Sequence, residues 1–196
     1  MSPARRAMSG DGLIAAIHAR RSVPRVRPDP LPREVVEELL GAAVRAPNHH
    51  LTAPWRFVVL AGDARRALGE AHARAVLRER ELPPEGIEKE AARLERAPVV
   101  VVCIVSPRAN DPVTVREDRD AVAAGVQNLL LAAGARGVGA MWRTGAMTDE
   151  PEVREHLGLA PSEAIVGFVY LGWPQEAPGP ASPRPPLADV TRWEGW

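Results

Sequence analysis

The chain has 196 residues, of which 45% are hydrophobic and 26% are charged, values typical of a folded domain with a sizeable core. Its 25 lysine and arginine residues are balanced by 25 acidic residues. No excess of positive charge is therefore present for a phosphate backbone, and we expect no nucleic acid partner. We expect a single domain spanning residues 1–196.

Two further features bear on location. The longest apolar run, residues 99–105, is far too short to span a bilayer, and no apolar stretch near the N-terminus is long enough for a signal peptide. The single cysteine, Cys103, cannot form an intrachain disulfide. We therefore expect a cytoplasmic protein with no membrane partner.

The first half of the chain predicts four helices and one strand. After residues 1–10, which we expect to be flexible, apolar spacing predicts a helix over 11–20. A proline-containing extended stretch leads to a second amphipathic helix, which begins at Pro32 and stops before Pro47. Residues 55–60 are typical of a strand, a third helix runs from 62 to about 81, and a short charged helix ends near residue 96.

The second half alternates strands and helices. The β-branched run 99–105 is typical of a strand covered on both faces. A long helix over 113–135, a strand over 138–142, a short helix over 149–157 and a strand over 165–171 follow. Four strands separated by long helices predict an α+β fold, arranged as three α/β/α layers. Residues 173–196, rich in proline, are expected to form an extended C-terminal arm.

Three short segments carry the candidate binding chemistry. Guanidinium, hydroxyl and backbone N–H groups at the edges of the predicted elements suit a phosphate and a polyol chain. Each segment alone also has an ordinary explanation, such as arginines favoured by a helix dipole, a surface-loop histidine, or a buried tryptophan beside an exposed arginine. The candidate residues are Arg20, Arg21, Ser22, Arg45, His49, Trp142, Arg143, Thr144 and Gly145.

Other motifs are excluded by their context. The glycines at 134, 137 and 139 follow a helix, whereas a Rossmann fingerprint precedes one, and no P-loop or nucleophile elbow is present. The histidines lack metal-ligand spacing, so we expect no metal site. Cys103 lies in an apolar run, as an inert core residue does. No acid–base dyad is evident from the sequence.

The order of four segments resembles the nitroreductase superfamily of FMN-dependent oxidoreductases, in its compact branch. The resemblance covers roughly residues 12–175 and implies a mixed, mainly antiparallel central sheet flanked by helices. The segments that carry it are Ile17-His18-Ala19-Arg20-Arg21-Ser22, Arg45-Ala46-Pro47-Asn48-His49 leading into Pro54-Trp55-Arg56-Phe57, Trp142-Arg143-Thr144-Gly145-Ala146-Met147-Thr148, and Ile165-Val166-Gly167-Phe168-Val169-Tyr170-Leu171-Gly172.

The resemblance also implies a homodimer with two FMN sites at the subunit interface. By matching positions, residues 20–22 hold the phosphate and ribityl chain, and residues 142–145 line the same FMN. Arg45 and His49 reach in from the second subunit. Members of that family embrace the partner subunit with extended segments, a role that suits the C-terminal arm.

The activity implied is hydride transfer from NADH or NADPH to N5 of FMN and on to a small electron-poor acceptor, such as a nitro compound or quinone, by a ping-pong mechanism. No protein side chain is then needed as a catalytic residue. Two alternatives remain open. One is another flavin enzyme on the same scaffold, a dehalogenase or a flavin-consuming oxygenase. The other is a non-catalytic interaction protein.

Overall fold

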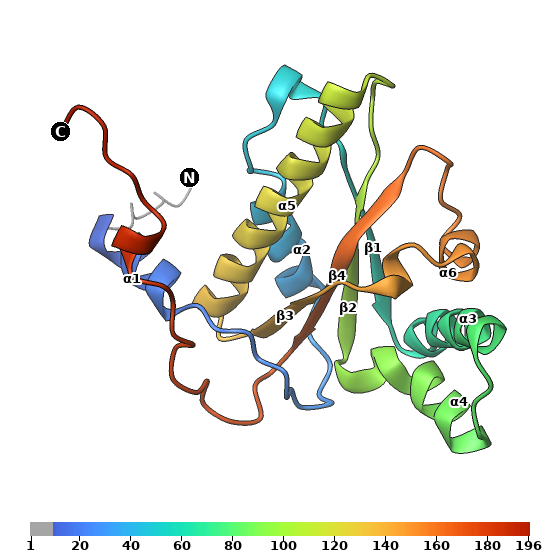
Figure 1. The fold of residues 1–196 in the computed structure, drawn as a ribbon. Helices are drawn as coiled ribbons and strands as arrows, with labels where there is room; N and C mark the ends of the chain where they lie inside the picture. The colour runs from blue at the N-terminus through green and yellow to red at the C-terminus, as the bar shows by residue number, and fades with distance from the viewer. Residues whose placement is uncertain (1–9) are drawn as a thin grey trace, which may run out of the picture.

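The computed structural model describes residues 10–196, and its framework is a four-stranded sheet (Figure 1). The strand order is β1-β2-β4-β3, and each pairing between these strands is antiparallel, so the expected mainly antiparallel sheet is confirmed. Residues 1–10 were expected to be flexible, and residues 1–9 of that segment lie outside the described residues. The strands are β1 (Trp55–Ala61), β2 (Val99–Val105), β3 (Gly139–Arg143) and β4 (Ala164–Gly172).

Helices cover both faces of this sheet, which confirms the three-layer arrangement (Figure 1). α2 and α5 lie on one face, and α3, α4 and α6 lie on the other. The ends of α2, α3, α5 and α6 fall within about three residues of the sequence prediction, whereas α4 ends at Ala91 and only a 3-10 turn continues to Arg96, where the predicted helix ended. The helices are α1 (Gly10–Ala19), α2 (Arg33–Ala43), α3 (Asp63–Glu79), α4 (Pro84–Ala91), α5 (Pro112–Ala135) and α6 (Pro151–His156), with 3-10 turns η1 (His49–Leu51), η2 (Ala92–Arg96), η3 (Ala146–Thr148) and η4 (Leu187–Asp189).

The composition of β2 explains why both faces are covered. All seven of its residues are buried. The odd-numbered side chains of 99–105 join the core beneath α2 and α5, and the even-numbered side chains of 100–104 join the core beneath α3 and α6. Since side chains alternate across a strand, a continuous apolar run must bury both faces. The sequence prediction for this strand is confirmed at both ends.

Helix α5 is the longest element and reaches the start of β3. The carboxylate of Asp111 caps its N-terminus by accepting a hydrogen bond from the backbone N–H of Thr114 (2.9 Å). Val122, Val126 and Leu129 form its fully buried stripe against the sheet. Gly137, with φ of 68°, makes the left-handed turn into β3.

The extended stretch after α1 runs along the outer edge of β3. The backbone N–H of Val23 donates to the carbonyl of Ala140 (3.0 Å), and Val26 forms a bridge with Pro174. The segment therefore fixes the end of α1 beside the strand that leads to residue 143. Residues 173–196 follow β4 as an exposed extended chain that includes η4. None of the helices within residues 10–196 has the length and apolar character needed to cross a bilayer.

Candidate functional site

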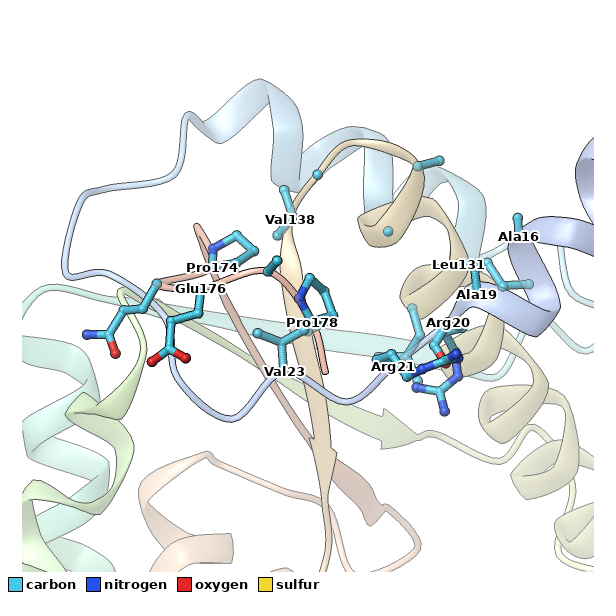
Figure 2. A pocket seen from close by; sticks show the side chains of 17 residues that line it. Ala16, Ala19, Arg20, Arg21, Val23, Leu131, Val138, Pro174, Glu176 and Pro178 are labelled. Atoms are coloured by element: carbon cyan, nitrogen blue, oxygen red, sulfur yellow. The ribbon is translucent and has the colours of Figure 1, made fainter. Parts of the chain in front are cut away.

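A cavity of about 590 Å³ opens beside the N-terminal candidate residues (Figure 2). Its walls come from the end of α1, the end of α5, the start of β3 and residues 174–178. Most of the lining is apolar, for example Ala16, Leu131 and Val138, whereas Arg20 and Arg21 lie together on one side (Figure 2). Its size falls within the range of small-molecule sites, roughly 300–1,000 Å³.

A neighbouring cavity of about 530 Å³ shares both arginines and adds Ser22. Residues 179–184 of the C-terminal arm close it, and Arg184 is among the lining residues. The sequence prediction missed this arginine because the arm was read only as an extended segment. The available signal was that Arg184 is the one charged residue between Glu176 and Asp189.

The guanidinium groups at these cavities lack carboxylate partners. Within residues 10–196, neither Arg20, Arg21 nor Arg184 forms an ion pair. Arg21 instead donates through Nη1 to the carbonyls of His18 (2.7 Å) and Arg20 (2.8 Å), where the α1 backbone ends. Three cations without a neutralising carboxylate form a setting that favours an anionic ligand.

The second candidate segment lies at the end of β3, and strand alternation divides it between the two faces of the sheet. Trp142 packs against the core beneath α5, together with Ala140. Arg143 turns to the opposite face, where its guanidinium carbon lies 5.5 Å from the ring centroid of Tyr170. Trp142 and Arg143 therefore face opposite sides of the sheet within one chain, and the expectation that residues 142–145 line a single site stays a prediction.

The indole of Trp142 carries a buried N–H group that has no hydrogen-bond partner among the described residues. Its position depends on Gly167 of β4, because a Cβ atom at 167 would lie 2.1 Å from the indole nitrogen. A buried donor without a partner is uncommon, and it fits a site that gains an acceptor when a ligand binds.

Arg143, Thr144 and Gly145 line a further cavity of about 470 Å³, which contains a charged cluster that the sequence did not predict. His72 of α3 is 4% exposed; its Nδ1 lies 2.7 Å from a carboxylate oxygen of Glu150 and its Nε2 lies 3.2 Å from one of Glu90.

Burial and hydrogen bonds around this cluster shift the pKa values of Glu90 and Tyr170. Burial opposes ionisation of Glu90, but hydrogen bonds from Arg93 and His72 outweigh it and hold the pKa of Glu90 below its ordinary value. Burial also raises the pKa of Tyr170, which lines the same cavity. The sequence assigned no partner to His72 because Glu90 and Glu150 are 18 and 78 residues away.

The third candidate segment lies elsewhere on the molecule. Arg45 and His49 are exposed, and His49 lines a separate cavity of about 480 Å³ beside Glu117 and Asp120 in the N-terminal half of α5. Within one chain these residues do not share a cavity with Arg20 and the arm.

One group near this loop has the composition of a metal site. The nearest ligand atoms of His49, His50 and Glu117 lie within 4.8 Å of one another. Both imidazoles are exposed. The absence of a metal site therefore stays a prediction.

Comparison with known proteins identifies relatives over most of the chain. The profile of the Nitroreductase family matches residues 17–173. The protein YdjA of Escherichia coli K12, named as an NAD(P)H nitroreductase, is 34% identical over 161 residues, covering 80% of this chain and 85% of that protein.

Two further matches extend the comparison. The 5,6-dimethylbenzimidazole synthase of Rhodospirillum rubrum is 33% identical over 178 residues, covering 85% of this chain and 83% of that enzyme. A Desulfovibrio desulfuricans protein, described as a nitroreductase and crystallised with FMN, is 26% identical with a TM-score of 0.73. That match covers 97% of this chain and 99% of the other.

Proposed function

Because the chain belongs to the nitroreductase family and is an oxidoreductase, we propose that it binds FMN, oxidises NADH or NADPH and reduces a small electron-poor acceptor such as a nitro compound or quinone. The names of its relatives and the FMN-containing neighbour support this proposal. A cytoplasmic location remains a prediction that rests on the sequence.

The observation that carries the proposal is the group of unpaired cations beside Ser22. Arg20, Arg21 and Arg184 line one cavity together with the hydroxyl of Ser22, and none of the three has a carboxylate partner within the described residues. A phosphate with two negative charges would neutralise these guanidiniums through charge-assisted hydrogen bonds. We assign this cavity to the phosphate and ribityl chain of FMN.

The end of β3 would then hold the flavin ring. The loop at Thr144 and Gly145 directly follows β3, and Ala140 of that strand accepts a hydrogen bond from the backbone N–H of Val23, the residue after Ser22. When bound, FMN would supply a hydride acceptor and donor at N5 in a ping-pong cycle. The role of the chain is to orient the ring, to hold the phosphate and to keep one open face for NAD(P)H and then for the acceptor.

We further propose that the site is completed in a homodimer. His49 and Arg45 are exposed and lie away from the phosphate cavity of their own chain, so they are free to approach the cavity of a partner. Leu13, Ile14 and Ile17 leave an apolar face of α1 about half exposed. Trp193 and Trp196, near the end of the arm, are 64% and 98% exposed. Covering this apolar surface favours association, with the arm embracing the partner.

The flavin assignment is tested by the visible spectrum of the purified full-length protein. A yellow protein that loses its absorbance band when NADH or NADPH is added without oxygen supports the proposal and shows which nucleotide is preferred. A protein that stays colourless after incubation with FMN contradicts it and favours a non-catalytic interaction protein.

Complementation between subunits tests the shared site. One variant carries Arg20→Ala with Arg21→Ala, and the other carries His49→Ala. Each homodimer then has two defective sites, whereas a mixed dimer has one site with all defects and one intact site. We expect mixed dimers to retain FMN at about half of their sites. Recovery no greater than the mean of the two homodimers would contradict a shared site.

One relative favours a second candidate. The synthase from Rhodospirillum rubrum is named for 5,6-dimethylbenzimidazole, which contains the same dimethylbenzene ring as flavin. A flavin-consuming oxygenase therefore remains the alternative activity. The two activities are separated by incubating the protein with excess NADPH, oxygen and free FMN. A nitroreductase-type enzyme leaves total flavin unchanged, whereas an oxygenase of this kind destroys it.

A further inference from the structure

The loop that carries His49 has an unusual backbone. Three of its residues that are not glycine, His50, Leu51 and Ala53, have positive φ values of 58°, 53° and 50°. Side chains disfavour this left-handed region, and a segment persists there only when its surroundings hold it. The flanking residues of α2 and β1 are regular, so the strain is confined to residues 50–53.

A chain of side-chain hydrogen bonds holds this loop to α5. The side-chain amide of Asn48 donates to Thr52 Oγ1 (2.9 Å) and to the carbonyl of His49 (3.1 Å), while Asn48 Oδ1 accepts from the backbone N–H of Ala53 (2.6 Å). The hydroxyl of Thr52 in turn donates to Asp118 Oδ1. The chain therefore runs from the loop backbone, through two side chains, to a residue of α5.

Asp118 anchors this chain of bonds and is unusual for a carboxylate. It is only 1% exposed, and within residues 10–196 it forms no ion pair. Its second oxygen faces the backbone N–H of Arg108 at 3.4 Å. The Thr52 hydroxyl has one proton, which it donates to Asp118, so its oxygen accepts the hydrogen bond from the Asn48 amide. This fixes the direction of every bond in the chain and the orientation of the Asn48 amide.

We infer that Asp118 is a positioning residue of the flavin site, acting through Thr52 and Asn48 to hold the loop so that His49 faces the partner subunit. This inference rests on the proposed function, in which His49 completes the FMN site of the partner. Burial of a carboxylate without a cation is costly, and many core positions in helices are apolar. The gain in return is a fixed loop conformation at the interface. Asp118 touches neither substrate nor cofactor in this scheme.

The test compares Thr52→Val with Thr114→Val in the full-length protein. Valine keeps a similar shape and removes the hydroxyl. Thr114 is a matched control because the same change removes a threonine hydroxyl at the start of α5, outside the loop, while the bond from the backbone N–H of Thr114 to Asp111 is kept. The measurement is the dissociation constant of added FMN, obtained by fluorescence titration after flavin removal, with dimerisation and melting temperature recorded for each variant.

We expect Thr52→Val to weaken FMN binding about three- to tenfold, as the loss of a hydrogen bond does, and Thr114→Val to leave it unchanged. The decisive readout is a double-mutant cycle with His49→Ala. If the hydroxyl acts through His49, then Thr52→Val has little further effect in that background. A purely structural role would produce the same fold-change in both backgrounds, and that result would overturn the inference.

Two further outcomes keep the test decisive. Should Thr52→Val fail to fold, Asp118→Asn replaces it, since its amide oxygen can still accept from Thr52 while its NH₂ group opposes the N–H of Arg108. Binding by Asp118→Asn that falls between wild type and Asp118→Ala supports the inference, and equal binding by all three contradicts it. Wild-type protein that binds no FMN would refute the proposed function itself, whereas normal wild-type binding with no effect of Thr52→Val refutes only the role of Asp118.

Discussion

Replacing Gly167 by alanine should damage both the fold and the flavin site. A Cβ atom at 167 would lie 2.1 Å from Trp142 Nε1 and 2.8 Å from the carbonyl oxygen of Arg143. The first contact is 1.3 Å shorter than the 3.4 Å at which ordinary contacts begin. The indole packs against the core beneath α5, and the carbonyl belongs to the β3 backbone, so neither can move without disturbing the strand end. Overpacking of this kind costs about 1–3 kcal/mol, and contact with backbone places Gly167→Ala near the upper end.

The assay is denaturant unfolding, together with the flavin content after purification. Gly41→Ala is the matched control, because a Cβ atom there has nothing within 4 Å and the residue lies within α2. That change should raise the free energy of unfolding by about 0.5–1 kcal/mol, since alanine favours helix. Gly167→Ala should lower it by about 3 kcal/mol and reduce bound flavin. An unchanged unfolding midpoint together with full flavin content would show that the indole of Trp142 does not pack against Gly167.

Three other residues give predictions from the packing and the titratable groups. Gly69→Ala should lower the free energy of unfolding by about 3 kcal/mol or more, because its Cβ would lie 1.8 Å from the backbone oxygen of Ala91 and force α3 and α4 apart. Burial raises the pKa of Cys103 to about 12, so its thiol should resist alkylation at pH 8 until the protein unfolds. Stability measured against Cys103→Ala should also fall as the pH rises above the ordinary thiol pKa of about 8.5, where only the unfolded thiol ionises. The pKa of Glu90 is lowered, so the stability that it contributes over Glu90→Gln is present at neutral pH and should disappear as the pH falls through its depressed pKa, as a series of unfolding measurements from pH 7 downwards would show.

The sequence predicts the framework well because a strand buried on both faces is apolar at every position, and such a run is visible in the sequence. The run 99–105 is apolar at every position, and the structure makes it a strand with the same ends. The extended segment after α1 was also predicted, since its prolines exclude a helix, and it pairs with the edge of β3. Local composition was sufficient in both cases because the physical cause is local.

The site is harder to predict from the sequence because its geometry depends on contacts between residues that are far apart in the chain. Strand alternation turns Trp142 and Arg143 to opposite faces, which the four-residue motif alone does not reveal. His72 lies between two carboxylates only because α3, α4 and the residue before α6 meet. Arg184 lines the same cavity as Arg20 and Arg21 only because residues 179–184 of the arm fold back beside the end of α1. Contacts between residues this far apart in the sequence leave no periodic signal.

The two halves of the candidate site are held in opposite ways, and this has a measurable consequence. The loop of His49 is fixed in advance by hydrogen bonds to Asp118, whereas Arg20, Arg21 and Arg184 face one cavity without a carboxylate among the described residues. Like charges that converge repel one another, and added salt weakens that repulsion, because the screening length shortens as salt is added and is about 10 Å at 0.1 M. Raising the salt concentration should therefore increase the melting temperature of the flavin-free protein more than that of the FMN-bound protein, in which phosphate already neutralises the arginines. Arg184→Gln should reduce this difference, whereas Arg192→Gln, which removes an arginine already paired with Glu194, should not. An equal response of both forms to salt would place the phosphate elsewhere.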